Sequence, residues 1–168
     1  VLYGKGFILD TLCGKTYALS PRSFYQINHD QTEVLYGLAV DAAHLTGNEV
    51  VLDAYCGIGT IGLTASGRAG QLIGVELNRD AVRDAIGNAK HNGVKNARFY
   101  AADATRWITE AAAAGQKADV IFMDPPREGS TPAFLDSVAR MAPRRVVYVS
   151  CNPETLARDL AHLTRKGY

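Results

Sequence analysis

The fold is decided by the stretch Val50-Val51-Leu52-Asp53-Ala54-Tyr55-Cys56-Gly57-Ile58-Gly59-Thr60-Ile61-Gly62. Apolar, β-branched residues run into an acid, Asp53, and a glycine-containing turn then leads into residues 61–65, which are typical of a helix start. Glycine is needed where the backbone has a positive φ or must approach a ligand closely. A strand, a glycine turn and a helix also aim free helix N–H groups at the end of the strand. The stretch therefore predicts a site for a nucleotide-like cofactor.

The same alternation continues along the chain. Strands are predicted at residues 49–55, 71–77, 97–101, 119–123 and 145–151. Helices are predicted at residues 60–66, 79–91, 105–114, 132–141 and 153–165. Asn78 and Asn152 suit helix N-caps, and Pro132 and Pro153 suit the first helical position. Successive βα units predict an α/β fold with a parallel, doubly wound sheet.

A different pattern precedes these units. Residues 1–28 form a lead-in segment, in which short strands at 6–9 and 16–19 flank a turn at 13–15, as in a β-hairpin. A helix is predicted from about residue 30 to residue 45. Its apolar residues keep the spacing of one helix face, and these are Val34, Leu35, Leu38, Ala39 and Ala42.

Composition limits the possible functions. The 168 residues are 47% hydrophobic and 21% charged, which is typical of a globular domain and excludes a disordered chain. A net charge of +1 gives no general attraction to nucleic acid, so contacts with RNA or DNA must be local or come from outside this chain. Nothing in the sequence indicates an oligomer.

The cysteines indicate the compartment. Cys13, Cys56 and Cys151 are far apart, odd in number and without a CxxC pair, so neither a disulfide framework nor a metal site is predicted. Reduced thiols fit a cytoplasmic protein. We see no signal peptide and no apolar run long enough to cross a membrane. Because the chain starts at Val1 and stops directly after a helical pattern, we expect it to be a fragment of a longer protein.

Polar residues end the predicted strands, where ligands bind in such sheets. Gly57, Gly59 and Gly62 spell GxGxxG, and Glu76 closes the next strand, where an acid can hold ribose hydroxyls. This pattern fits NAD as well as S-adenosylmethionine, and the glycines could also serve only a tight turn. Asp103, after the third strand, could accept a hydrogen bond from an adenine amino group or cap the following helix.

The fourth and fifth strands end in more specific elements. Asp124 is followed by Pro125-Pro126-Arg127, and an acid held by two prolines can align an acceptor base with a methyl donor, although diprolines also occur in plain loops. Cys151 precedes a helix N-terminus, which favours a thiolate, and Arg127 could add to this effect. We interpret Cys151 as a nucleophile rather than an inert core residue. Cys13 and Cys56 are interpreted as inert.

These elements together resemble a known family, the RNA uracil-C5 methyltransferases. The resemblance rests on residues 53–60, on Asp124-Pro125-Pro126-Arg127, on residues 150–160 beginning Ser150-Cys151-Asn152-Pro153, and on residues 20–28. It implies a Rossmann-like class I fold that uses S-adenosylmethionine to methylate C5 of uridine in RNA through a covalent adduct between a cysteine and C6. By resemblance, Gln26, Tyr55, Glu76 and Asp124 bind the cofactor, Cys151 is the nucleophile, and Asp124 also assists catalysis.

The resemblance also sets expectations about substrate and completeness. It is closest to the bacterial 23S rRNA enzymes, so rRNA is favoured over tRNA. Residues 29–168 then correspond to a catalytic domain that lacks its last strands and the glutamate that removes the C5 proton. We therefore expect these residues to bind S-adenosylmethionine but to turn over poorly. Three alternatives stay open: an NAD-dependent oxidoreductase, an exocyclic-amine methyltransferase that needs no Cys151, and a non-catalytic RNA-binding module.

Overall fold

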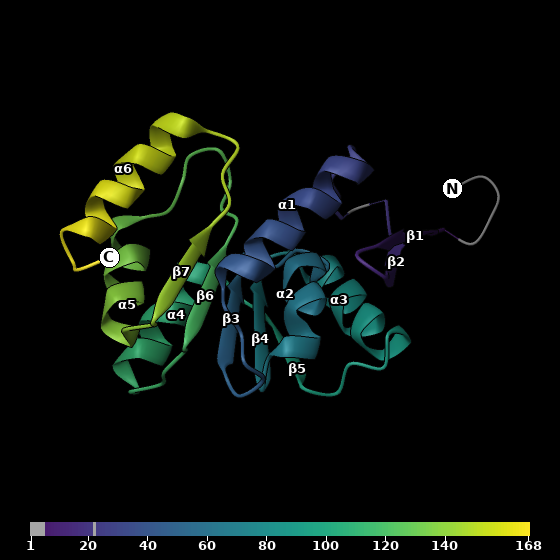
Figure 1. Cartoon of the computed structure of the whole chain (residues 1–168), viewed down its shortest axis with the longest axis horizontal. Coiled ribbons are helices and arrows are strands. Elements are labelled where there is room, and N and C mark those ends of the chain that lie inside the picture. Colours follow the sequence, from purple (N-terminus) through teal and green to yellow (C-terminus); the bar gives the residue numbers. More distant parts are fainter. Residues whose placement is uncertain (1–5, 22) are drawn as a thin grey trace.

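The computed structural model describes residues 6–21 and 23–168 (Figure 1). The strands are β1 (Ile8–Leu12), β2 (Lys15–Leu19), β3 (Val50–Ala54), β4 (Gln71–Glu76), β5 (Ala97–Ala101), β6 (Val120–Met123) and β7 (Arg145–Tyr148). The helices are α1 (His29–Ala42), α2 (Thr60–Ala65), the short 3-10 helix η1 (Ser66–Arg68), α3 (Arg79–His91), α4 (Ala104–Ala113), α5 (Pro132–Met141) and α6 (Pro153–Thr164).

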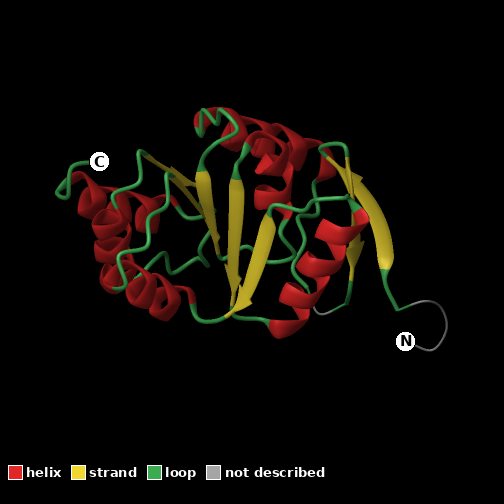
Figure 2. Ribbon diagram, turned by 90° about the horizontal axis from the view of Figure 1, so that it is seen from below, coloured by secondary structure: helices red, strands yellow, loops and turns green. Residues whose placement is uncertain are grey.

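Strands β3 to β7 form one parallel sheet in the order β5-β4-β3-β6-β7, with helices on both faces (Figure 2). The predicted α/β architecture is confirmed. The chain runs outward from β3 to β5, returns across the sheet, and runs outward again from β6 to β7. The strand order therefore reverses between β3 and β6, and a ligand site is expected beyond their carboxyl ends.

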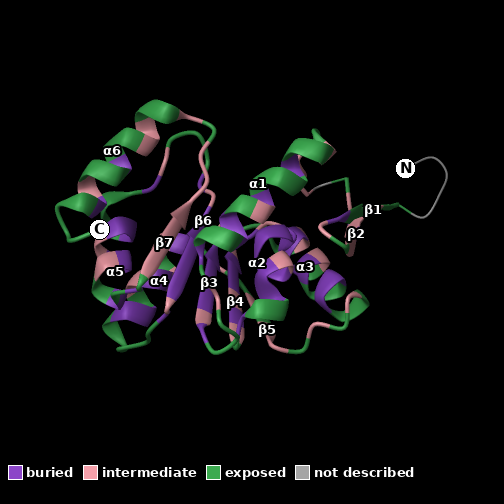
Figure 3. Ribbon diagram, viewed as in Figure 1, coloured by how far each residue is buried: buried purple, intermediate pink, exposed green. Residues whose placement is uncertain are grey.

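The core lies in two layers, one on each face of the sheet. Alternate residues of β3 point to opposite layers, so Val51 packs with α1, α2 and α3, whereas Leu52 packs with α4 and α5. Strand β6 repeats this arrangement with Phe122 on the first face and Ile121 on the second. Both strands are buried on both faces (Figure 3), and each large apolar side chain contributes roughly 1.5–3 kcal/mol to folding. Because β3 and β6 are buried on both faces, the carboxyl ends of these two central strands are held in place.

Helix α1 occurs where the sequence predicted it, but the predicted apolar face is wrong. Only Ala39 of that set is buried, and the inward face carries Thr32, Tyr36 and Val40. Val34 and Leu38 are exposed. Apolar residues lie around most of this helix, so their spacing could not show which side would face the sheet.

The lead-in hairpin is built on β1 and β2 and is shifted from its prediction. Strand β1 begins at Ile8 and runs to Leu12, because Cys13 and Gly14 have positive φ values of 50° and 72° and form a two-residue turn. The boundary predicted at residue 28 stays a prediction.

Asn88 of α3 and Asn92, the C-cap residue of this helix, bind the free edge of β2. Asn92 accepts a hydrogen bond from the Thr16 N–H at 2.9 Å and donates one to the Thr16 carbonyl at 2.7 Å. Asn88 accepts from the Ala18 N–H at 2.8 Å. Asn88 and Asn92 are four residues apart, which is a rise of about 6 Å along a helix, and Thr16 and Ala18 are two residues apart, which is about 6.8 Å along a strand. The two side-chain amides are therefore spaced to meet alternate residues of β2. The side chains thus replace a neighbouring strand and fasten the hairpin to the sheet domain.

Candidate functional site

The turn after β3, residues 55–59, is called here the glycine turn. Tyr55, Gly57 and Gly59 all have positive φ, at 64°, 54° and 85°. Tyr55 was predicted to end the strand, but its left-handed backbone takes it out of β3. A non-glycine residue in this conformation is uncommon and stores strain, which proteins concentrate at functional sites. The Gly59 N–H bonds to the Cys56 carbonyl at 2.8 Å, and α2 starts at the next residue.

Asp53 lies beneath the glycine turn, and the sequence placed it among the strand-end acids without predicting a role for it. Its carboxyl is 1% exposed and accepts a hydrogen bond from the Gly62 N–H at 2.8 Å. Burial raises the pKa of Asp53 to about 7, against the opposing effect of that hydrogen bond. A Cβ at Gly62 would lie 2.7 Å from the Asp53 Oδ2, so the third glycine of the motif is required by this close approach.

Glu76, at the end of β4, is fixed by two backbone groups. Its Oε2 accepts from the Gly57 N–H at 3.1 Å, and its Oε1 accepts from the Asn78 N–H at 2.7 Å. The carboxylate is thereby joined to the glycine turn. A carboxylate has about four acceptor positions, so two remain for hydroxyl groups of a ligand.

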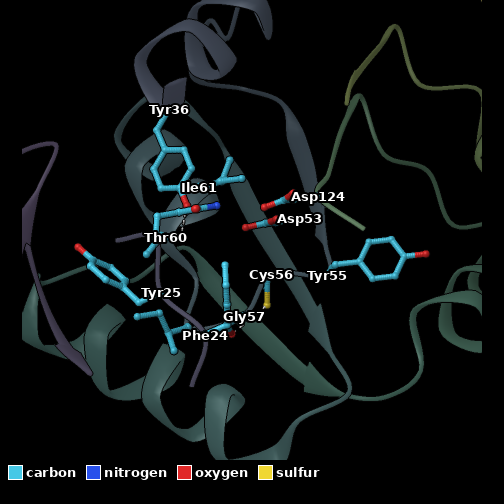
Figure 4. Close-up of a pocket in the computed structure, with 12 residues that line it drawn as sticks. Phe24, Tyr25, Tyr36, Asp53, Tyr55, Cys56, Gly57, Thr60, Ile61 and Asp124 are labelled. Atoms are coloured by element: carbon cyan, nitrogen blue, oxygen red, sulfur yellow. Dashed lines mark hydrogen bonds between the residues drawn. The ribbon is translucent and has the colours of Figure 1, made fainter. Parts of the chain in front are cut away.

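A pocket opens above the carboxyl ends of β3 and β6 (Figure 4). Its lining residues are Phe24, Tyr25, Gln26, Tyr36, Asp53, Tyr55, Cys56, Gly57, Ile58, Thr60, Ile61 and Asp124. The structure thus brings together four of the predicted residues, which are Gln26, Tyr55, Gly57 and Asp124. Partial burial raises the pKa of Asp124 to about 6. Two acids of raised pKa, Asp53 and Asp124, therefore line one pocket.

The pocket also contains residues that the sequence did not single out. Tyr36 reaches it from α1, and its hydroxyl accepts a hydrogen bond from the Thr60 Oγ1 at 3.2 Å. Burial raises the pKa of Tyr36 to about 12. The sequence signal for Asp53 was its position as the acid at the end of an apolar run, whereas no local pattern in α1 marks Tyr36.

The other predicted cofactor residues lie around the pocket. Gly59 is the residue before α2, and its φ of 85° requires glycine. Asp103 is the N-cap of α4, where its Oδ1 accepts from the Arg106 N–H at 2.8 Å. The capping interpretation of Asp103 is confirmed, and its contact with an adenine stays a prediction. Cys56 is buried, and burial raises the pKa of its thiol well above the usual value, as suits an inert core cysteine.

Cys151 is exposed and lies between β7 and the N-cap of α6, outside the pocket lining. Strand β7 neighbours β6, and the Val149 N–H bonds to the Met123 carbonyl at 2.9 Å, one residue before Asp124. Asn152 donates through its Nδ2 to the Arg127 carbonyl at 3.1 Å. The cysteine and the acid therefore stand at the ends of adjacent strands, and the observed contact with Arg127 runs through its backbone.

No group of three or more metal-ligating side chains occurs among residues 6–21 and 23–168. No helix in these ranges is long and apolar enough to cross a membrane.

Comparison with known proteins identifies the family. The family model described as tRNA (Uracil-5-)-methyltransferase matches residues 11–167. The chain belongs to this family. An uncharacterized RNA methyltransferase of Lactiplantibacillus plantarum is 51% identical over 168 residues, which are 100% of this chain and 37% of that protein. An uncharacterized RNA methyltransferase of Halalkalibacterium halodurans is 50% identical over 168 residues, again 100% of this chain and 37% of that protein. The chain thus spans little more than a third of the length of these relatives.

Solved structures agree with the family. The crystal structure of Pyrococcus abyssi tRNA (uracil-54, C5)-methyltransferase, in complex with S-adenosyl-L-homocysteine, is 34% identical with a TM-score of 0.83. It matches 96% of this chain and 38% of that one. A SAM-dependent methyltransferase from Streptococcus mutans, 13% identical with a TM-score of 0.78, shows the fold alone. Membership of the uracil-5 methyltransferase family favours a methyl donor over a nicotinamide at the glycine turn.

Proposed function

We propose that the protein methylates C5 of uridine in RNA and that Cys151 forms a covalent bond with C6 of the target base. The observation that carries this proposal is the position of two groups. An exposed thiol follows β7, between this strand and α6, and Asp124, directly after the adjacent β6, lines the pocket at the glycine turn. A pyrimidine lying across these two strand ends would meet a nucleophile on one side and the methyl donor on the other.

The cofactor is S-adenosylmethionine, and the residues present fit it. Glu76 ends β4 with two acceptor positions for ribose hydroxyls, as described above. Gln26, Tyr55 and Asp124 line the pocket, where they can surround the methionine part, and Asp103 stands at the next strand end for the adenine. When bound, S-adenosylmethionine supplies an electrophilic methyl group on a sulfonium.

The chain's own residues account for the activation of the base. Uracil C5 is too weak a nucleophile to accept a methyl group unaided. The Cys151 thiolate adds to C6, the S–C6 bond forms, and the electron pair of the C5–C6 double bond moves into an enolate. C5 would then form a bond to the methyl carbon of the donor as the bond from that carbon to the sulfonium sulfur breaks, which leaves S-adenosylhomocysteine. A base removes the C5 proton, and the electron pair left at C5 restores the double bond while the C6–S bond breaks and frees the thiolate.

Asp124 positions the base in this scheme. Its pKa of about 6 leaves it mostly ionised at neutral pH, so it can accept a hydrogen bond from the edge of the uracil. The target base must leave its stack to reach the pocket. We assign no residue of this chain as the base that takes the C5 proton, and we propose that the 168 residues alone turn over poorly.

We propose an RNA substrate, with 23S rRNA ahead of tRNA, and a cytoplasmic site of action. The net charge of +1 makes a general attraction to RNA weak, so most RNA contacts are proposed to come from the rest of the longer protein. Fragments of 23S rRNA and tRNA, each offered to the whole protein with labelled S-adenosylmethionine, would test the order of preference.

The covalent step can be trapped. RNA that contains 5-fluorouracil carries fluorine in place of the C5 proton, so elimination is blocked and the adduct accumulates. We expect the whole protein to form an adduct whose peptide maps to Cys151, and Cys151→Ala to form none. Cys13→Ala is the matched control, because Cys13 lies on the hairpin turn. Methylation retained by Cys151→Ala would contradict the proposal and favour the exocyclic-amine alternative.

A further inference from the structure

The loop between β6 and α5, residues 124–131, is called here the β6–α5 loop. Its backbone is bound by side chains of another element, the N-terminal half of α6. The Arg127 carbonyl accepts from the Asn152 Nδ2 and from the Thr155 Oγ1, both at 3.1 Å. One turn further along α6, Arg158 donates through its Nη2 to the Glu128 carbonyl at 2.8 Å. These side chains lie on one face of the helix.

Asp159 completes the attachment. This residue is 1% exposed, and its Oδ2 accepts from the Ser130 N–H at 2.7 Å and from the Tyr148 hydroxyl at 2.7 Å. Arg158 donates through its Nε to the Asp159 Oδ1 at 2.9 Å, so the two side chains orient each other. A buried carboxylate is stable only when it is paired and hydrogen-bonded, and here the loop supplies one of its donors.

Gly129 shows how closely the loop approaches the helix. Its φ is +75°, and a Cβ at this position would lie 2.5 Å from the Arg158 Nη2 and 2.6 Å from the Asp159 Oδ2. Glycine is therefore required for both its conformation and the space. The loop rests directly on the Arg158–Asp159 pair.

The β6–α5 loop also contacts the glycine turn, on the cofactor side of the site. The Ser130 Oγ lies 3.3 Å from the hydroxyl of Tyr55 in the glycine turn. The aromatic ring of Tyr55 packs against Phe134 of α5, with ring centroids 5.3 Å apart. Asp159 and Ser130 thus join three parts of the site: the glycine turn, the β6–α5 loop and the helix that starts beside Cys151.

We infer that Thr155, Arg158 and Asp159 are positioning residues for methyl transfer. They hold the β6–α5 loop on α6, and so set the place of Asp124 relative to the Cys151 sulfur. The inference rests on the proposed function. Attack by the sulfur needs the base within near-contact distance, and a misplacement of about 1 Å can lower a rate about 10²-fold. The loop has one internal backbone bond, from the Gly129 N–H to the Pro126 carbonyl, and α6 supplies more of its other bonds than any other element does.

The chain offers substitutions that remove these bonds without emptying the core. The Arg158 side chain is 56% exposed, so Arg158→Met leaves the apolar core intact. Thr155→Val keeps the shape of the side chain and loses its hydroxyl, whereas Thr155→Ser keeps the hydroxyl. Arg68→Met is the matched control, because Arg68 is 62% exposed and forms a surface ion pair with Asp41 at 2.9 Å.

The experiment measures three quantities in the whole protein. These are the rate of adduct formation with RNA containing 5-fluorouracil at saturating RNA, the affinity for S-adenosylhomocysteine by calorimetry, and the midpoint of thermal unfolding. We expect Arg158→Met to slow adduct formation about 10²-fold and Thr155→Val about tenfold, with cofactor affinity within about threefold of wild type. Thr155→Ser and Arg68→Met should react at the wild-type rate.

The outcomes separate this inference from the proposed function. If the wild-type protein forms no adduct, the proposed function fails. If it forms one and Arg158→Met reacts equally fast, the positioning role is wrong. A loss of adduct rate, cofactor affinity and unfolding midpoint together in Arg158→Met and Thr155→Val would show a role in overall folding, and would also overturn the inference.

Discussion

The glycine turn and the β6–α5 loop lie at the ends of adjacent strands, yet they are held in opposite ways. The glycine turn is supported by its own βα unit, through the bonds from Gly59 to Cys56 and from Gly62 to Asp53, and by the next strand along the chain, β4, through Glu76. The β6–α5 loop is supported by α6, through bonds between residues far apart in sequence, such as Ser130 and Asp159. One loop is fixed by local geometry and the other by a distant helix.

This difference has a consequence for the site. The glycine turn keeps its shape whenever its βα unit and the neighbouring strand β4 are folded, which suits a pocket for a cofactor. A loop that depends on another helix is positioned only when that helix is in place. Because α6 begins beside Cys151, the side of the site proposed to receive the base is assembled as one body with the proposed nucleophile.

The largest effect is expected at Gly62, in the locally held unit. In Gly62→Ala, the new methyl group would meet the Asp53 Oδ2 at 2.7 Å and the Leu72 Cδ1 at 2.9 Å, in a part of the core that cannot move easily. We expect a loss of about 2–3 kcal/mol in the free energy of unfolding, measured by urea denaturation of the 168-residue chain. Gly67→Ala is the control, because Gly67 is exposed. Equal midpoints for both variants would show that α2 is not tightly packed against β3 and β4 at Gly62.

A smaller effect is expected at Gly129, in the loop held by α6. Gly129 and Gly115 share a φ of +75°, but a Cβ at Gly115 would meet no atom within 4 Å among the described residues. Gly115→Ala should therefore cost about 1 kcal/mol of unfolding free energy through backbone strain alone, and Gly129→Ala about 2 kcal/mol. The difference between the variants measures the contact with α6. Equal losses of unfolding free energy in the two variants would mean that the β6–α5 loop moves away from α6 at no cost in stability.

The effect that is smallest within any one pH unit is a pH dependence of stability due to Asp53, which lies in β3 beneath the glycine turn. Because burial raises the pKa of this carboxyl from 3.8 to about 7, the folded protein keeps a proton that the unfolded chain releases in that range. The stability due to Asp53 is therefore complete below about pH 4 and falls as the pH rises to about 7, by at most about 1.4 kcal/mol per pH unit.

The comparison with Asp53→Asn isolates this contribution, because the asparagine oxygen can still accept from the Gly62 N–H. The variant should gain stability relative to wild type as the pH rises from 5 to about 7, in urea titrations without cofactor. Asp124→Asn should show the same trend over a range that ends near pH 6. Parallel curves for wild type and Asp53→Asn would mean that Asp53 is ionised in the folded state at low pH.

The same contrast explains how much the sequence could predict. The strand-to-helix alternation, the caps at Asn78 and Asn152 and the presence of a glycine turn between β3 and α2 depend on neighbouring residues, and each was predicted and is confirmed. The inward face of α1 and the place of Tyr36 depend on which surface the helix meets, which no local pattern contains. The bonds between α6 and the β6–α5 loop were also not predicted, because they join residues that only the sheet topology brings together.

The pairing of Asn88 and Asn92 with β2 bears on how the chain matures on the ribosome. Their partners Ala18 and Thr16 are made 70 and 76 residues earlier. At a synthesis rate of roughly 5–20 residues per second, the edge of β2 remains unpaired for about 4–15 s before Asn88 and Asn92 are made. During that interval the edge is open to pairing with another nascent strand, and the arrival of α3 closes it. Completion of α3 therefore closes this edge of the hairpin to pairing with another chain.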